Sequence, residues 1–223
     1  MLILDPKRTA AVCVDLHRGH LDPAVATLPL APERAARVVR DTAPFLRELR
    51  ARGVPVVHVV SKYRDSEEIA SNPFWKHINE DPSKARKGIL GHNIGNAPGT
   101  QVVPELWDDR DILVDTKKRY SSFLGTDLEF VLRSRLGVDT FILCGVNTNT
   151  CVMCAAFEGT NRDFRVVLAE EGVDTMDGEE MHRFALRSIA ASLAWVLHTD
   201  EILAALDRGA QPEAVPEMAE QAG

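Results

Sequence analysis

Three residues whose types could together hydrolyse an amide lie far apart in the sequence: Asp15, Lys117 and Cys151. Cys151 is the best candidate nucleophile, because it follows an apolar run and a polar turn at the start of a predicted helix. The partial positive charge and free N–H groups there stabilise a thiolate and can hold an oxyanion. Lys117 would lower the thiol pKa further from about 8.5. Asp15 could take the thiol proton and return it to a leaving amine, which is the chemistry of a covalent acyl-enzyme.

Short apolar runs alternate with helical patterns and predict the elements that position these residues. Strands are predicted at 9–16, 54–60, 111–115, 140–145, 164–169 and 194–197. Helices are predicted at 31–52, 126–137, 149–162, 177–192 and 199–206, with capping sequences at Thr126–Glu129 and Asp177–Glu180. This alternation predicts a three-layer α/β/α, doubly wound fold with a mostly parallel, six-stranded sheet of Rossmann-like topology.

One stretch of about 50 residues, Ser61–Arg110, lacks a clear strand. A structureless loop of that length is uncommon inside a domain, so we expect short helices that form a lid over the sheet edge. The whole chain, 1–223, is predicted to be a single domain, and about 207–223, rich in Ala, Glu, Gln and Pro, to be a C-terminal tail.

Ligands of an open parallel sheet bind at the carboxyl ends of its strands. Asp15, Lys117 and Cys151 each follow a different predicted strand, so the fold itself should bring them to one edge. Candidate substrate-binding residues come from the same strand ends and from the 61–110 segment: Tyr63, Arg64, Trp75, His92, Tyr120 and Asn149. An arginine such as Arg64 or Arg119 would suit a substrate that carries a carboxylate.

Composition excludes several classes of function. The formal net charge is −7, with no block of Lys or Arg, which disfavours nucleic acid as a partner. No apolar run approaches the roughly 20 residues that cross a bilayer, and the N-terminus lacks the order of a signal peptide, so we expect a cytoplasmic protein without a membrane partner. Its four cysteines are then expected to be thiols.

Other interpretations of the same residues stay open. Cys151 and Cys154 form a C-x-x-C at a helix start, which is compatible with a thiol redox protein, although no cis-proline strand is evident to face the pair. Asp15, His17, His20 and Asp22 could form a metal cluster, but their spacing in a turn is weak evidence, and we expect neither metal nor cofactor. A catalytically silent relative of an enzyme that binds a partner is a third possibility.

The candidate residues stand within longer motifs. Ala11-Val-Cys-Val-Asp15, Asp115-Thr-Lys-Lys-Arg-Tyr-Ser-Ser-Phe123 and Cys144-Gly-Val-Asn-Thr-Asn-Thr-Cys151 occur in this order. Together they resemble the isochorismatase-like cysteine hydrolases, which include N-carbamoylsarcosine, biuret and ureidoacrylate amidohydrolases and nicotinamidase. The resemblance covers about 9–206. It implies Asp15 as general acid and base, Lys117 as catalytic lysine and Cys151 as nucleophile. It also implies a non-proline cis peptide bond at Val146–Asn147, with the N–H groups of Asn147 and Cys151 as an oxyanion hole.

Departures from the family pattern narrow the expected activity. His17 stands where the family commonly has Gln, so we expect it to contribute to substrate orientation. The Asp and His metal ligands of the nicotinamidase branch are missing after the second strand, and isochorismatases proper do not rely on a cysteine. The sequence therefore predicts a cysteine amidohydrolase that cleaves a linear C–N bond of a small carbamoyl or ureido compound. Because family members are usually oligomers, we expect a homodimer or homotetramer.

Overall fold

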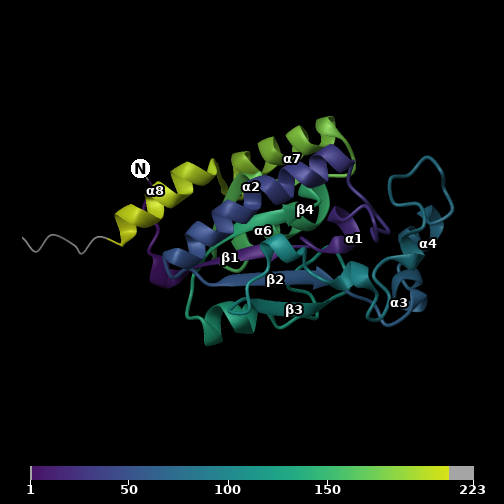
Figure 1. The fold of residues 1–223 in the computed structure, drawn as a ribbon, viewed down its shortest axis with the longest axis horizontal. Coiled ribbons are helices and arrows are strands. Elements are labelled where there is room, and N and C mark those ends of the chain that lie inside the picture. Colours follow the sequence, from purple (N-terminus) through teal and green to yellow (C-terminus); the bar gives the residue numbers. More distant parts are fainter. Residues whose placement is uncertain (1, 211–223) are drawn as a thin grey trace, which may run out of the picture.

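Six parallel strands form one sheet in the computed structural model, which describes residues 2–210 (Figure 1). The strands are β1 (Thr9–Val14), β2 (Val56–Ser61), β3 (Ile112–Lys117), β4 (Thr140–Val146), β5 (Arg165–Asp174) and β6 (Trp195–Leu197). Their spatial order is β3-β2-β1-β4-β5-β6, and every neighbouring pair runs parallel. The chain therefore winds outward in both directions from the pair β1 and β4, which confirms the predicted doubly wound α/β fold.

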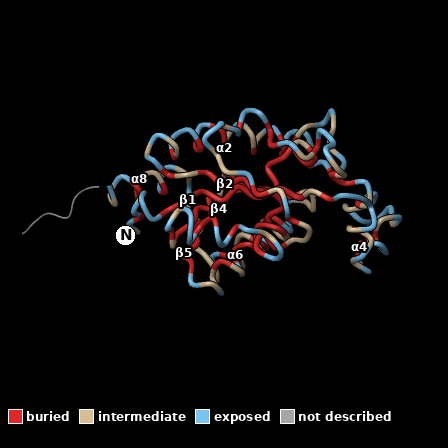
Figure 2. Tube along the Cα trace, turned by 90° about the horizontal axis from the view of Figure 1, so that it is seen from below, coloured by how far each residue is buried: buried red, intermediate tan, exposed pale blue. Residues whose placement is uncertain are grey.

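Helices cover both faces of this sheet. They are α1 (Arg18–Leu21), α2 (Pro32–Ala51), α3 (Ser66–Ala70), α4 (Pro73–Ile78), α5 (Leu128–Phe130), α6 (Met153–Thr160), α7 (Glu179–Ser192) and α8 (Thr199–Gly209). Apolar side chains of α2 and α8 pack on one face, and those of α5, α6 and α7 pack on the other. Figure 2 shows α2 and α8 on the opposite side of the strands from α6. Every residue of β1, β2 and β4 is buried, as expected for parallel strands between two helical layers.

The connection between β2 and β3, residues 62–111, is named here the covering segment. It contains α3, α4 and three short 3₁₀ helices, η2 (Ile89–Gly91), η3 (Pro98–Thr100) and η4 (Pro104–Leu106). Its first part lies beyond the carboxyl end of β2, where Figure 1 shows α3 and α4 past the strand's arrowhead, and its last residues return to the amino end of β3, which is parallel to β2. The predicted short helices are therefore present. Three of its apolar side chains, Trp75, Ile78 and Ile89, pack together in a small core separate from the two main ones.

The observed boundaries differ from the predicted ones in a few places. β5 continues to Asp174, beyond the predicted end at 169, because the chain pairs with β4 again after an irregularity: Gly145 lies opposite Val173. The polar residues Glu170 and Glu171 mask this extension in the sequence. The helix α8 continues to Gly209, so 207–209 are helical rather than tail. The rest of the predicted tail, 211–223, falls outside the described residues.

Neither predicted capping sequence caps its helix in the expected way. Thr126 accepts a hydrogen bond from the N–H of Leu128, not from that of Glu129, while Glu129 pairs with Arg162. Gly178 occupies the position before α7 without a side-chain cap, because the carboxylate of Asp177 is engaged by Arg86. Within residues 2–210 we find no helix with the length and apolar character that a bilayer crossing requires.

Candidate active site

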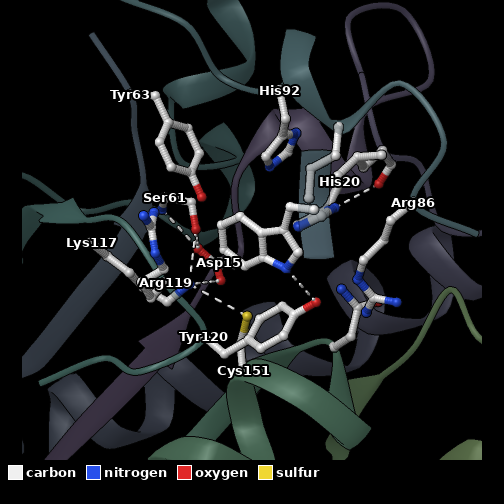
Figure 3. Close-up of a pocket in the computed structure, with 14 residues that line it drawn as sticks. Asp15, His20, Ser61, Tyr63, Arg86, His92, Lys117, Arg119, Tyr120 and Cys151 are labelled. Carbon is white, nitrogen blue, oxygen red and sulfur yellow. Dashed lines mark hydrogen bonds and ion pairs between the residues drawn. The ribbon is translucent and has the colours of Figure 1, made fainter. Parts of the chain in front are cut away.

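A small cavity opens at the carboxyl edge of β1, β2, β3 and β4, beneath the covering segment (Figure 3). Its volume is about 30 Å³, enough for one or two water molecules. The residues that line it are Asp15, His20, Leu28, Ser61, Tyr63, Trp75, Arg86, Ile89, His92, Lys117, Arg119, Tyr120, Asn147 and Cys151. The site expected from strand ends thus exists as a small chamber with largely buried walls, and three residues from distant parts of the chain meet in it.

Asp15 follows β1 in a left-handed backbone conformation (φ 54°), which Asp tolerates better than most residues and which turns the chain at the strand end. Its Oδ1 accepts hydrogen bonds from the backbone N–H (2.8 Å) and the hydroxyl (2.9 Å) of Ser61. Burial alone would raise the pKa of this fully buried carboxyl. The ammonium of Lys117 and a contact with His17 outweigh burial and hold the Asp15 pKa well below its usual range.

Lys117 is the last residue of β3, and its side chain is almost wholly buried. The Nζ donates to Asp15 Oδ2 (2.6 Å) and Ser61 Oγ (2.8 Å), and it lies 3.4 Å from Cys151 Sγ. Burial opposes the charged form, yet the negative charge of Asp15 raises the Lys117 pKa above its ordinary value. The ammonium therefore stays charged and spans the space between a carboxylate and a sulfur.

Cys151 lies in a π-helical turn, η6 (Thr148–Val152), that leads from β4 into α6. The chain reaches this turn through Gly145, at φ 140°, where a Cβ atom would lie 2.2 Å from the carbonyl oxygen of Val14. Only glycine lets β4 pass β1 so closely at this point. The next peptide bond, Val146–Asn147, is cis. These backbone features place Cys151 on the floor of the cavity, opposite the covering segment.

The thiol pKa differs from the sequence-based expectation of a lowered value. Burial raises the pKa of Cys151 to about 11, and the carboxylate of Asp15 adds to this shift, while the ammonium of Lys117 acts against it. The prediction considered the cation and the helix start but not the loss of hydration in a closed chamber beside a second negative charge. At rest the structure therefore favours a neutral thiol beside a carboxylate that can accept its proton.

Aromatic rings and two arginines form the other walls. The indole N–H of Trp75 donates to the hydroxyl of Tyr120 (3.2 Å), and the guanidinium of Arg119 lies 5.1 Å from the Trp75 ring centre. Arg86 reaches the chamber from the covering segment, and Asp177 fixes it through two bonds of 2.9 Å. Figure 3 shows Arg86 on the opposite side of Cys151 from Lys117. The chamber thus has a cation on each side of the sulfur.

Some of the predicted substrate-binding residues line the cavity and others do not. Tyr63, Trp75, His92 and Tyr120 line the cavity. Arg64 does not: its side chain is 84% exposed and pairs with Glu68, because the strand end directs it outward.

Asn149 and His17, which were also predicted to bind substrate, do not line the cavity. Asn149 instead donates to Asp177 (2.8 Å), so that it supports the residue that holds Arg86. His17 is wholly buried behind the wall, with Nε2 3.5 Å from Asp15 Oδ1.

Sequence reasoning gave no catalytic or substrate-binding role to three polar residues of the chamber. Ser61 bonds both Asp15 and Lys117, and its position at the end of β2 was the available signal. Arg86 lies in a polar stretch without any pattern, so only the folded chain reveals it. His20 lines the cavity, and together with His17 and His92 it forms the group of side chains in 2–210 that could hold a metal ion.

Comparison with known proteins places the chain in a family. The isochorismatase domain matches residues 9–201. The protein belongs to the isochorismatase family. Among its relatives, the uncharacterized isochorismatase family protein YecD of Escherichia coli O157:H7 is 34% identical over 92% of this chain and all of its own length. The ureidoacrylate amidohydrolase RutB of Caulobacter segnis is 26% identical and covers 88% of this chain and 84% of its own.

Solved structures of this family share the same fold. A cysteine hydrolase from Pseudomonas syringae pv. phaseolicola superposes with a TM-score of 0.77 at 24% identity, over 94% of this chain and 98% of its own. An N-carbamoylsarcosine amidase from Thermoplasma acidophilum gives a TM-score of 0.66 at 25% identity, over 86% and 97%. The family resemblance inferred from the sequence motifs is therefore confirmed, and the chain is a hydrolase of the isochorismatase family.

Proposed function

We propose that this isochorismatase-family hydrolase is a cysteine amidohydrolase that cleaves the C–N bond of a small carbamoyl or ureido compound. The contacts of a single ammonium group carry the proposal. Lys117 Nζ lies 2.6 Å from Asp15 and 3.4 Å from Cys151 Sγ, beside a cavity of about 30 Å³. Base, cation and nucleophile are thus within reach of one reacting carbonyl. The relatives that act on ureidoacrylate and N-carbamoylsarcosine support the choice of substrate class.

The first half of the reaction forms a thioester. As Sγ of Cys151 attacks the carbonyl carbon, Asp15 accepts the thiol proton. The ammonium of Lys117 stabilises the negative charge that develops on the sulfur in this step. The backbone N–H groups of Asn147 and Cys151, both of which line the chamber, hold the oxygen of the tetrahedral intermediate. Asp15 then gives its proton to the departing nitrogen, and the C–N bond breaks with release of the amine or ammonia.

The second half restores the thiol. Water adds to the thioester carbon, Asp15 takes one of its protons, and the C–S bond breaks when the sulfur regains a proton. The acyl part leaves as a carboxylate or, from a carbamoyl substrate, as a carbamate. A neutral resting thiol suits this scheme, because the Asp15 carboxylate is then in the form that can accept the proton.

Two arginines near the chamber favour substrates with a carboxylate. Arg119 rests on the Trp75 ring, and Asp177 holds Arg86 beside Tyr120. Guanidinium groups recognise carboxylates through paired hydrogen bonds. We therefore expect N-carbamoyl or ureido acids to be better substrates than neutral amides of the same size.

The test is ammonia release from a panel of ureido and carbamoyl compounds, each with and without a carboxylate. Cys151→Ala should abolish release, whereas Cys154→Ala should keep most of it, since Cys154 is half-buried and does not line the chamber. Mass spectrometry of the wild type during turnover should detect an acyl group on the peptide that contains Cys151. Equal loss in both cysteine variants, together with dithiol reduction activity, would favour the thiol redox function instead. A lack of hydrolysis across the panel, with no acyl group on the Cys151 peptide, would favour a silent relative.

A further inference from the structure

Three buried histidines lie close together on the side of the chamber across from Cys151. One ring nitrogen from each of His17, His20 and His92 lies within 4.8 Å of those of the other two. The ring centres are 4.7, 5.5 and 4.8 Å apart. Three imidazoles bound to one tetrahedral zinc ion through nitrogens at about 2.0–2.1 Å have ring centres roughly 5 Å apart. The ring centres therefore have the spacing of a three-histidine metal site, and the nitrogens would draw in to about 3.3 Å from one another on binding an ion.

Two of these rings, those of His20 and His92, have one nitrogen held as in metal-binding histidines. Nδ1 of His20 bonds the carbonyl oxygen of Leu28 (2.6 Å), and Nδ1 of His92 bonds the hydroxyl of Thr27 (2.7 Å). Nε2 of His17 accepts from the amide nitrogen of Asn93 (3.1 Å), and it lies 3.5 Å from the carboxylate of Asp15, to which it would donate in the tautomer that binds a metal through Nδ1. A ligating histidine almost always engages a carboxylate, a carbonyl or water with its second nitrogen, which fixes the ring.

The remaining nitrogens lack partners. Nδ1 of His17 is fully buried without a hydrogen bond, and no described residue bonds Nε2 of His20 or of His92. An unpartnered polar atom in the interior is costly, so Nδ1 of His17 points to a missing partner, while His20 and His92 line the cavity.

The three ligands come from two separate loops that the fold packs closely. His17 and His20 flank Gly19 at the start of α1, and His92 follows η2 in the covering segment. A Cβ atom on Gly19 would lie 2.2 Å from Oδ1 of Asn93, so glycine there allows the loops to touch. Figure 3 shows His20 and His92 side by side above the labelled residues Asp15 and Cys151. An ion held here would border the reaction chamber rather than lie in a remote part of the surface.

We infer that His17, His20 and His92 form a binding site for one divalent transition-metal ion of the zinc type. Its remaining coordination position would face the chamber, because His20 and His92 line that space. There the ion can bind an oxygen or nitrogen atom of the substrate and hold it over Cys151. It would also join the turn after β1 to the covering segment, and so stabilise the closed chamber. The inference goes beyond the proposed amidohydrolase activity and does not depend on it.

The test measures metal binding directly, without any assay of hydrolysis. The untagged full chain is stripped with a chelator and titrated with Zn²⁺ in competition with a chromophoric chelator. We expect one Zn²⁺ per chain, and a loss of affinity of at least about 100-fold in His20→Asn and in His92→Asn. His77→Asn, which alters an exposed histidine of α4, should bind as the wild type does.

Cobalt(II) provides a second readout on the unaltered protein, which holds even if a histidine variant fails to fold. Co²⁺ should give the visible absorption of a tetrahedral site without thiolate charge-transfer bands, and Cys151→Ala should leave that spectrum unchanged. Binding of less than one equivalent would overturn the inference. So would unchanged affinity in both histidine variants, or thiolate bands that disappear in Cys151→Ala, since these place the ion elsewhere.

Discussion

The protein buries two carboxylate–cation pairs at opposite ends of β3. At the carboxyl edge, Asp15 and Lys117 meet at 2.6 Å, and both are almost fully buried. At the amino end of β3, Asp111 and Arg50 meet at 2.6 Å with side chains that are 2% and 9% exposed. Judged by burial and distance alone, the two pairs are equivalent. Their surroundings differ, and this difference indicates that Arg50 and Asp111 form a structural ion pair, whereas Lys117 and Asp15 are candidate catalytic residues.

Arg50 directs its donors to acceptors that hold the fold together. Its Nε and Nη2 bond the two oxygens of Asp111, and Nη2 also bonds the carbonyl of Leu106. This arrangement joins α2 to the start of β3. Lys117 divides its donors between Asp15 and Ser61 and points at a sulfur beside a cavity. A buried ion pair is therefore weak evidence of function on its own, and the adjacent nucleophile and space for a substrate are what distinguish the second pair.

The strongest test of this comparison is Lys117→Met. We expect kcat/KM for the best substrate of the panel to fall by roughly 10³-fold, because charge on the sulfur and on Asp15 loses its stabilising cation. The neighbouring Lys118→Met is the matched control. Lys118 bonds Glu68 and the carbonyl of Lys62 and does not line the chamber, so its loss should change kcat/KM by only a few-fold. Similar losses in both variants would show that general positive charge, and not the placement of one ammonium, supports the reaction.

Much of the fold and the centre of the site follow from the sequence. Apolar runs locate all six strands, and Asp15, Lys117 and Cys151 are found because each follows one of them. This reasoning works because a parallel sheet brings its carboxyl strand ends to one edge whatever the loops between them do. The walls of the chamber are less predictable. Arg64 and Arg86 look alike in the sequence, yet one is exposed and the other is held by Asp177.

The covering segment explains most of the remaining differences. Its path depends on tertiary contacts, such as the packing of Gly19 against Asn93, that no local pattern encodes. The same contacts bring His92 beside His20, which lies 72 residues earlier in the sequence. The predicted lowering of the thiol pKa was wrong for a related reason: the sequence indicates a cation near Cys151, but it does not show how deeply the sulfur is buried.

Arg50→Met should lower the stability of the protein and leave its activity nearly unchanged, whereas Lys117→Met should lower the activity. Removing one partner leaves Asp111 buried without its cation, so we expect the free energy of unfolding to fall by about 3–5 kcal/mol. Urea unfolding followed by circular dichroism measures this change. The kcat of the protein that remains folded should stay within about two-fold of the wild type, since the pair lies at the far end of the strands from Cys151. A large loss of kcat in a fully folded variant would instead mean that the amino-end pair supports the chamber.

The smallest expected effect concerns the state of the thiol at rest. Because burial and Asp15 raise the Cys151 pKa to about 11, the thiolate fraction should grow about tenfold for each pH unit between 7 and 10. Iodoacetamide labelling of the Cys151 peptide, quantified by mass spectrometry, should follow that slope without a plateau. In Lys117→Met the rate should be lower at every pH, because the thiolate loses its cation. A plateau near neutral pH in the wild type would show that Lys117 outweighs burial. The resting site would then be a thiolate–ammonium pair, and Asp15 would act first as the acid for the leaving amine rather than as the base for the thiol.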